Sequence, residues 1–234
     1  MKRWMVALAG GLVVLCAPFP SHEAPTAAPA NLDVQTHESQ ESMTPSAALA
    51  HLKEGNGRFV ANAMKPRNWS ANVAATAGGQ FPFAAVLSCM DSRAPAEIVF
   101  DQGLGDVFSV RVAGNVVNAD ELGSLEYAIH AGTKLIVVMG HTGCGAIKGA
   151  LDDTKLGNLT GLLTKVRPAV TAAHCSSSKD DACVTKVSEL NVRESLQEIL
   201  KKSPYIKEHV DQGKAKLVGA LYDIATGKAT FLEN

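Results

Sequence analysis

Three side chains that bind transition metals well occupy related places in the sequence: Cys89, His141 and Cys144. Cys89 follows a short apolar run, and His141 and Cys144 follow another, with two residues between them. This gap lets an imidazole and a thiolate bind one ion, and Gly143 removes side-chain bulk from the tight turn. Two thiolates and one imidazole favour Zn²⁺, and three protein ligands leave the fourth tetrahedral position open, as in catalytic zinc sites.

An acid and a base stand directly beyond the first of these cysteines, in the run CMDSR at 89–93. Asp91 and Arg93 are close enough in sequence to form a bidentate ion pair beside a metal. Each residue also has a simpler interpretation, because an H-x-x-C pair occurs by chance, an isolated Cys is usually a small buried hydrophobic residue, and Asp91 and Arg93 could form a surface ion pair. The position of the acid and base next to Cys89 favours the metal site.

These residues need a scaffold that brings strand ends together, and the apolar pattern predicts one. Short apolar runs typical of buried strands lie at 83–87, 107–112 and 135–139. Helical patterns lie between and after them, at 94–100, 122–131, 159–173 and 184–201. Strands that alternate with helices predict an α/β fold, with a mainly parallel β-sheet flanked by helices and a ligand crevice at the carboxyl ends of the strands.

Two further elements complete a predicted domain that spans 44–234. Thr44 and Pro45 are typical of a helix N-cap followed by Pro at the first helical position, so we expect an N-terminal helical arm from there. Near the C-terminus, the runs 215–222 and 228–232 flank Thr226-Gly227. They predict a β-hairpin that adds antiparallel strands to one edge of the sheet.

Composition limits the classes of protein that this chain can belong to. A length of 234 residues and 46% hydrophobic content suit one ordinary domain with a core of its own. The 22 Lys and Arg residues nearly balance the 23 Asp and Glu residues, and no long basic block is present. This charge distribution excludes the electrostatic signature of a nucleic-acid-binding surface.

The N-terminal residues differ in composition from the rest. Two basic residues precede an apolar run that ends at Leu15 and is followed by small residues, which predicts a signal peptide over 1–24. The run is shorter than the roughly 20 residues of a membrane-spanning helix, so we expect an exported protein, periplasmic or secreted, without a stable membrane span. Cys16 resembles a lipidation site, but Leu15 is larger than such a site prefers. Residues 25–43 are polar, without apolar periodicity, and predict a disordered linker.

The combination of C-x-D-S-R with a later H-x-x-C resembles the β-class carbonic anhydrases. The likeness extends over 44–234 and includes the run RVAGN at 111–115, which is similar to the family's R-N-x-A/G-N. The resemblance implies a Zn²⁺ cofactor with the ligands Cys89, His141 and Cys144, and a catalytic dyad of Asp91 and Arg93. It implies reversible hydration of carbon dioxide to bicarbonate on a four-stranded parallel core sheet, in a homodimer or a tetramer of dimers whose active sites lie near the dimer interface.

The resemblance also implies a substrate pocket, which carries over by distance from the motif. It consists of an amide that hydrogen-bonds substrate, the turn glycine and residues of an apolar cleft: Gln80, Gly143, Phe108, Ala113 and Tyr127. Gln80 and Phe108 could instead be ordinary loop and core residues.

Two positions depart from the family pattern. Val112 stands at the second position of the R-N run, which we expect to affect packing and not chemistry. Val86 stands three residues before Cys89, where members with a separate inhibitory bicarbonate site carry Trp. We therefore expect that inhibitory site to be absent.

Three other interpretations of the motif stay open. Some proteins with this zinc motif hydrolyse carbon disulfide or carbonyl sulfide, and nothing in the residues separates them from carbonic anhydrases. A zinc-stabilised binding protein without catalysis is the second, although a structural zinc would want a fourth protein ligand. The third is a disulfide between Cys89 and Cys144, which would leave His141 and the acid–base pair without a purpose.

Two more cysteines lie in a polar stretch between two helical patterns. In an exported protein, Cys175 and Cys183 are close enough to be expected to form a disulfide. Two free thiols, or a second metal site that includes His174, are the alternatives.

Overall fold

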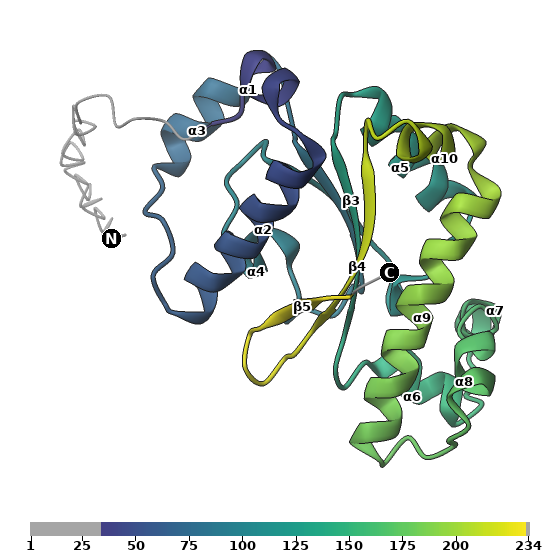
Figure 1. Cartoon of the computed structure of the whole chain (residues 1–234). Helices are drawn as coiled ribbons and strands as arrows, with labels where there is room; N and C mark the ends of the chain where they lie inside the picture. The colour runs from purple at the N-terminus through teal and green to yellow at the C-terminus, as the bar shows by residue number, and fades with distance from the viewer. Residues whose placement is uncertain (1–33, 233–234) are drawn as a thin grey trace, which may run out of the picture. The chain divides into compact units, whose positions relative to one another are not determined.

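The structure is a computed structural model that describes residues 34–232 (Figure 1). Short apolar segments form the strands of one sheet, in the order β2-β1-β3-β4-β5. The strands are β1 (Ala84–Ser88), β2 (Val107–Arg111), β3 (Leu135–His141), β4 (Lys216–Tyr222) and β5 (Ala229–Phe231). Neighbouring strands run parallel from β2 to β4, and β5 pairs antiparallel with β4. The predicted α/β fold with a four-stranded parallel core is confirmed.

Helices cover both faces of this sheet, as Figure 1 shows. One face packs against α2 (Pro45–Val60) and α4 (Ala96–Val99), and the other against α5 (Ala119–His130), α9 (Asp181–Lys202) and α10 (Pro204–Asp211). Alternate residues of a strand point to opposite faces, so Val86 of β1 lies in the first core and Leu87 in the second. This double coverage explains why β1 and β3 are apolar along nearly their whole length.

A third apolar cluster lies at the carboxyl end of the sheet and contains Cys89 and Cys144. It is built from α6 (Gly145–Leu151), α7 (Gly157–Leu163), α8 (Arg167–Ala173), the first turns of α9 and the residue after the short helix η1 (Ala113–Asn115). The two cysteines therefore sit in a packed environment that the sheet and these helices hold in place.

The predicted C-terminal hairpin is confirmed as the antiparallel pair of β4 and β5, but the expectation that both strands run antiparallel to the rest of the sheet is wrong for β4, which lies parallel to β3. The chain reaches β4 through α9 and α10, and a crossover of this length returns the chain in the same direction as β3. The connection from β4 to β5 is a short turn, in which the Asp223 N–H donates to the Lys228 carbonyl, and it reverses the chain. Of the two strands of the hairpin, β4 thus continues the parallel sheet, and β5 is the added antiparallel strand.

The helix expected over 159–173 is also wrong as a single element, because the structure contains α7 and α8 there. Pro168 stands at the start of α8, where its missing N–H costs no hydrogen bond but prevents one long helix from continuing through it. The other expected helices are present, with different ends. Helices α3 (Trp69–Thr76), α6 and α10 were not predicted.

Ordered structure begins earlier than expected, so the prediction of a disordered linker to Met43 is wrong for its last residues. Helix α1 (His37–Ser42) starts at a capping box between Thr36 and Ser39. Gln40 is 5% exposed, and its Nε2 donates to the carbonyls of Pro82 (2.8 Å) and Ala131 (3.0 Å). One buried amide thus fixes a segment that has no apolar pattern, while α2 begins at Pro45 with Thr44 as its N-cap, as predicted.

The expected signal peptide over 1–24, the lipidation site at Cys16 and the linker residues 25–33 lie outside the described residues. Within residues 34–232, no helix is both long enough and apolar enough to span a bilayer.

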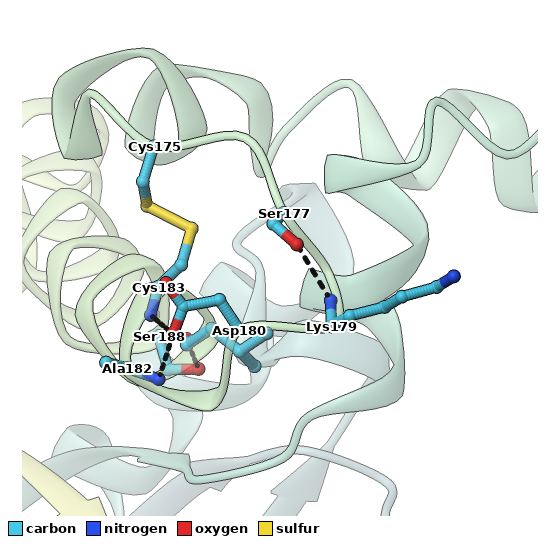
Figure 2. The surroundings of a disulfide bond; sticks show 8 residues. Cys175, Ser177, Lys179, Asp180, Ala182, Cys183 and Ser188 are labelled. Carbon is cyan, nitrogen blue, oxygen red and sulfur yellow. Dashed lines mark hydrogen bonds between the residues drawn. A yellow bond between two sulfur atoms is a disulfide. The ribbon is translucent and has the colours of Figure 1, made fainter.

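Figure 2 shows the disulfide between Cys175 and Cys183, whose Cα atoms are 5.9 Å apart. It connects the end of α8 to the first turn of α9, where the Asp180 carboxylate accepts hydrogen bonds from the backbone of Ala182 and Cys183. The predicted disulfide is confirmed.

Candidate metal centre and active site

The three predicted metal ligands come together at the carboxyl end of the sheet. One potential ligand atom from each of Cys89, His141 and Cys144 lies within 4.8 Å of the other two, and all three residues are buried. The sulfur atoms of the cysteines are 3.9 Å apart, and both thiols are free, which excludes a disulfide between them. Two sulfurs bound at 2.3 Å to one tetrahedral zinc would be separated by about 3.8 Å, so the spacing fits that ion.

His141 presents one ring nitrogen to this group. Its Nδ1 lies 2.9 Å from the carbonyl oxygen of Thr142, which fixes the tautomer that donates from Nδ1. Its Nε2 is fully buried and has no hydrogen-bond partner within residues 34–232. A buried nitrogen lone pair without a donor is costly unless something else binds it, and a metal ion beside two sulfurs would do so.

Local backbone geometry accounts for the convergence. Cys89 follows the last residue of β1, and β3 extends through His141, so both lie at neighbouring strand ends. Gly143 adopts φ +65°, a left-handed conformation that turns the chain back, and α6 begins directly after Cys144. A Cβ atom on Gly143 would also lie 3.2 Å from Ile224. Glycine therefore meets two requirements of this turn, the left-handed backbone and the limited space.

Asp91 and Arg93 form the expected bidentate ion pair. Arg93 Nε donates to Asp91 Oδ1 at 2.9 Å, and its Nη2 donates to Oδ2 at 2.8 Å. The Arg93 backbone N–H also donates to Oδ1, at 3.0 Å. The carboxylate lies beside the metal group, with Oδ2 3.8 Å from His141 Nε2, but it is not part of that group.

Sequence reasoning missed a role for Arg111, the last residue of β2. Its Nε donates to the Cys89 carbonyl at 3.2 Å, and its Nη2 donates to the Asp91 carbonyl at 2.5 Å. Arg111 therefore fixes the backbone of Cys89, a predicted metal ligand, and of Asp91. Its membership of the RVAGN run was the available signal.

The electrostatics of the site favour a bound cation. A hydrogen bond with Cys144 lowers the pKa of the Cys89 thiol to about 4, although burial opposes the shift. Burial also opposes protonation of His141, but contacts with the Cys89 sulfur outweigh it and raise the pKa of the imidazole. Hydrogen bonds from Arg93 hold the pKa of Asp91 well below its usual range. Cys89 and Asp91 are thus anionic at neutral pH.

The residues of the expected substrate pocket are not all brought together. Gly143 lies between His141 and Cys144, and Ala113 precedes the glycine whose N–H reaches Cys89. Phe108 and Tyr127 make an edge-to-face contact, with ring centroids 5.9 Å apart, in an open cavity of about 790 Å³ between β2 and α5. Gln80 lies apart from both groups, before β1, with the end of α3 and Leu104 around it.

Comparisons with known proteins agree with this geometry. The sequence profile of the family described as "Carbonic anhydrase" matches residues 84–229. The chain is 38% identical over 199 residues to carbonic anhydrase 2 of Mycobacterium tuberculosis H37Rv, covering 81% of this chain and 94% of that protein. It is also 38% identical over 190 residues to the carbonic anhydrase of Mycolicibacterium smegmatis, covering 79% and 91%.

Solved structures of the same kind resemble the fold. The β-carbonic anhydrase CafA of Aspergillus fumigatus has a TM-score of 0.63 at 30% identity, covering 80% of this chain and 90% of that one. A tetrameric β-carbonic anhydrase of Sordaria macrospora has a TM-score of 0.62 at 26% identity, covering 70% and 91%. The chain belongs to the carbonic anhydrase family, and its fold places it in the β class. The family assigns it carbonic anhydrase activity, which is a lyase activity.

Proposed function

We propose that this protein is a zinc-dependent enzyme that reversibly hydrates carbon dioxide to bicarbonate and a proton. The observation that carries the proposal is the set of three buried ligands with an unpartnered imidazole nitrogen, next to an acid that an arginine holds outside the set. Cys89, His141 and Cys144 would hold the ion. Zinc with an open coordination position lowers the pKa of water to about 7 and so supplies a hydroxide-like nucleophile at neutral pH.

Asp91 orients the attacking oxygen in this scheme. Its carboxylate is ionised at neutral pH and can accept a hydrogen bond from the attacking hydroxyl group, which turns an oxygen lone pair towards the carbon of carbon dioxide. A new carbon–oxygen bond then forms, and the electron pair of one carbonyl bond moves to oxygen, giving bicarbonate.

Arg93 keeps Asp91 in this role. With both carboxylate oxygens bonded to the guanidinium, Asp91 is prevented from serving as a fourth metal ligand. A structural zinc site would use four protein ligands, so the arrangement favours catalysis over a zinc-stabilised binding protein.

The proposal is tested by zinc content and stopped-flow carbon dioxide hydration on the same preparation. We expect about one zinc per chain and activity that is lost with the metal and restored by zinc. Carbonyl sulfide and carbon disulfide should be assayed beside carbon dioxide. Hydrolysis of these compounds with negligible carbon dioxide hydration would replace the proposed substrate, and a zinc-loaded but inactive protein would contradict catalysis.

We propose that the site stays open at neutral pH because it lacks the inhibitory bicarbonate site. Val86 is fully buried in β1 and offers no polar group. Hydration rates should therefore show no cooperative inhibition by bicarbonate, which steady-state assays at increasing bicarbonate concentration would reveal.

We propose that the enzyme is a homodimer or a larger assembly of dimers. β2 is an edge strand, and Phe108 with the 56% exposed Tyr127 lines an open cavity beside it. The Sordaria macrospora relatives are described as tetrameric. Sedimentation analysis should show a species of at least twice the chain mass, and a monomer at micromolar concentration would contradict the proposal.

We also propose that the protein is exported. The Cys175–Cys183 disulfide supports this, since disulfides persist mainly in oxidising compartments. N-terminal sequencing of the mature protein should find that the first residues have been removed, and recovery of the uncleaved chain from the cytoplasm would contradict export.

A further inference from the structure

We propose that Asn191, on α9, is a positioning residue of the metal centre. It fixes the η1 turn so that the backbone N–H of Gly114 donates to the sulfur of Cys89. The inference rests on the proposed metal site. It adds that α9, through Asn191 and the η1 turn, sets the hydrogen bond that the Cys89 sulfur accepts.

The contact at the ligand is a hydrogen bond of 3.4 Å from the Gly114 nitrogen to Cys89 Sγ. A thiolate that accepts such a bond gives up part of its electron density, so the bond tunes how strongly the sulfur binds a metal. Its strength depends on where the peptide before Gly114 points. That direction is set by the backbone of η1.

The η1 turn has an unusual backbone that must be held in place. Gly114 has φ +69°, and the next residue, Asn115, has φ +44°, in a region that residues with a Cβ rarely adopt. Space is also short, because a Cβ on Gly114 would lie 3.2 Å from the Cβ of Ala146 and 3.5 Å from Val166. Surrounding groups therefore have to stabilise this conformation.

Helix α9 supplies that support from two buried side chains one turn apart. Asn191 Nδ2 donates to the Gly114 carbonyl at 2.7 Å, and Ser195 Oγ donates to the Asn115 carbonyl at 3.0 Å. Asn191 is 2% exposed and Ser195 is 5% exposed. Residues four apart lie on the same face of a helix, so both side chains bind the η1 turn.

Only one of these two bonds leads to the metal ligand. Asn191 binds the residue whose own N–H reaches Cys89. Ser195 binds Asn115, whose N–H donates instead to the Val112 carbonyl. The two side chains have similar burial and similar partners, so Ser195 is a matched control for the general cost of losing a buried hydrogen bond.

The test compares Asn191→Leu with Ser195→Ala in the full-length protein. Leucine has the same number of side-chain heavy atoms and the same branch point as asparagine, but no donor. We expect zinc to pass from Asn191→Leu to a chelator at least about tenfold faster than from wild type, as for other outer partners of metal ligands, and Ser195→Ala to stay within about twofold. In the cobalt(II)-substituted proteins, the thiolate-to-cobalt absorption band should shift in Asn191→Leu alone.

Two controls keep the test decisive. Asn191→Ser, whose side chain is too short to make the same bond, replaces Asn191→Leu if the leucine variant does not fold, and it should show the same changes. Equal effects of the Asn191 and Ser195 variants, or an unchanged release rate and cobalt spectrum in a folded Asn191 variant, would overturn the inference. A wild-type protein that binds no zinc would instead refute the proposed function.

Discussion

The four cysteines that the structure describes form two pairs in one apolar region, and the pairs have opposite chemistry. Cys89 and Cys144 are free, with sulfurs 3.9 Å apart, and both belong to the cluster at the carboxyl end of the sheet. Cys175 and Cys183 are bonded, and Cys183 belongs to the same cluster. Residue type is thus shared, and all but the half-buried Cys175 are buried, so the difference lies in the backbone that carries each pair.

The free pair is held apart by rigid elements. Cys89 follows β1, Cys144 precedes α6, and hydrogen bonds from Arg111 and Gly114 reach Cys89. The bonded pair flanks a polar loop between α8 and α9, and within residues 34–232 no imidazole or carboxylate is hydrogen-bonded to its sulfurs. A cysteine pair becomes a metal site where the fold fixes a gap of the right width and adds a third ligand.

Removing a sulfur from the free pair should have the largest effect. Cys144→Ser replaces a thiolate by a neutral hydroxyl, a far poorer zinc ligand, so we expect loss of zinc and a fall in carbon dioxide hydration of well over about 100-fold. Metal analysis and stopped-flow assays measure both. A variant with one tightly bound zinc per chain and normal turnover would show that the ligand set is wrong.

The next largest effect should separate the acid–base pair from the metal ligands. Arg93→Ala frees Asp91 to become a fourth ligand, so zinc should remain while the rate falls by about 100-fold. The double variant Arg93→Ala, Asp91→Asn should hold less of this closed form, because an amide binds zinc less well than a carboxylate.

X-ray absorption at the zinc edge would count the ligands in each variant. Full activity of Arg93→Ala would refute the gating role. Loss of zinc from that variant would make Arg93 part of the scaffold.

Breaking the bonded pair should have a smaller effect, on stability and not on metal content. The Cys175→Ser, Cys183→Ser variant loses a short cross-link, which the chain-entropy relation values at about 2.5 kcal/mol of unfolding free energy. Denaturant titration with zinc present measures the change. An unchanged denaturation curve together with loss of zinc would contradict the roles that we assign to the two pairs.

The smallest expected effect is a labelling rate of Cys89 that hardly changes with pH. Because the pKa of Cys89 is lowered to about 4, its thiolate persists as pH falls, until the pH approaches that value. In chelator-treated protein, methanethiosulfonate labelling of Cys89 should therefore be nearly constant from about pH 5 to 8, where an ordinary thiol slows about tenfold per pH unit. A rate that falls tenfold per unit over this range would contradict the lowered pKa.

Much of the scaffold and the metal ligands could be predicted from the sequence. The runs that became β1 and β3 are buried on both faces, so nearly every residue in them is apolar. Cys89, His141 and Cys144 stand directly after those runs, and parallel strands bring such positions together. The apolar runs that identify these strands in the sequence are thus the same residues that form the core of the sheet.

Other features depend on contacts that have no local pattern. The direction of β4 is set by the length of the connection before it, and α1 by a single amide that binds two distant loops. Gln80 was assigned by its distance from the motif, and the structure places it away from the metal ligands. Asn191 looks like any polar residue of a long helix until its partner, the Gly114 carbonyl, is known.

The amide of Gln40 has a consequence for how far the N-terminus can be shortened. It bonds the carbonyls just before β1 and β3, and it fills the space where a Cβ on Gly132 would lie 2.7 Å from its Oε1. A chain trimmed to Thr44, by a protease or by design, would lose both bonds at a cost of about 1–3 kcal/mol for each group left without a partner. The weakened strands would be the two whose opposite ends carry Cys89 and His141. We therefore expect a chain shortened to Thr44 to hold a metal less tightly at those two residues.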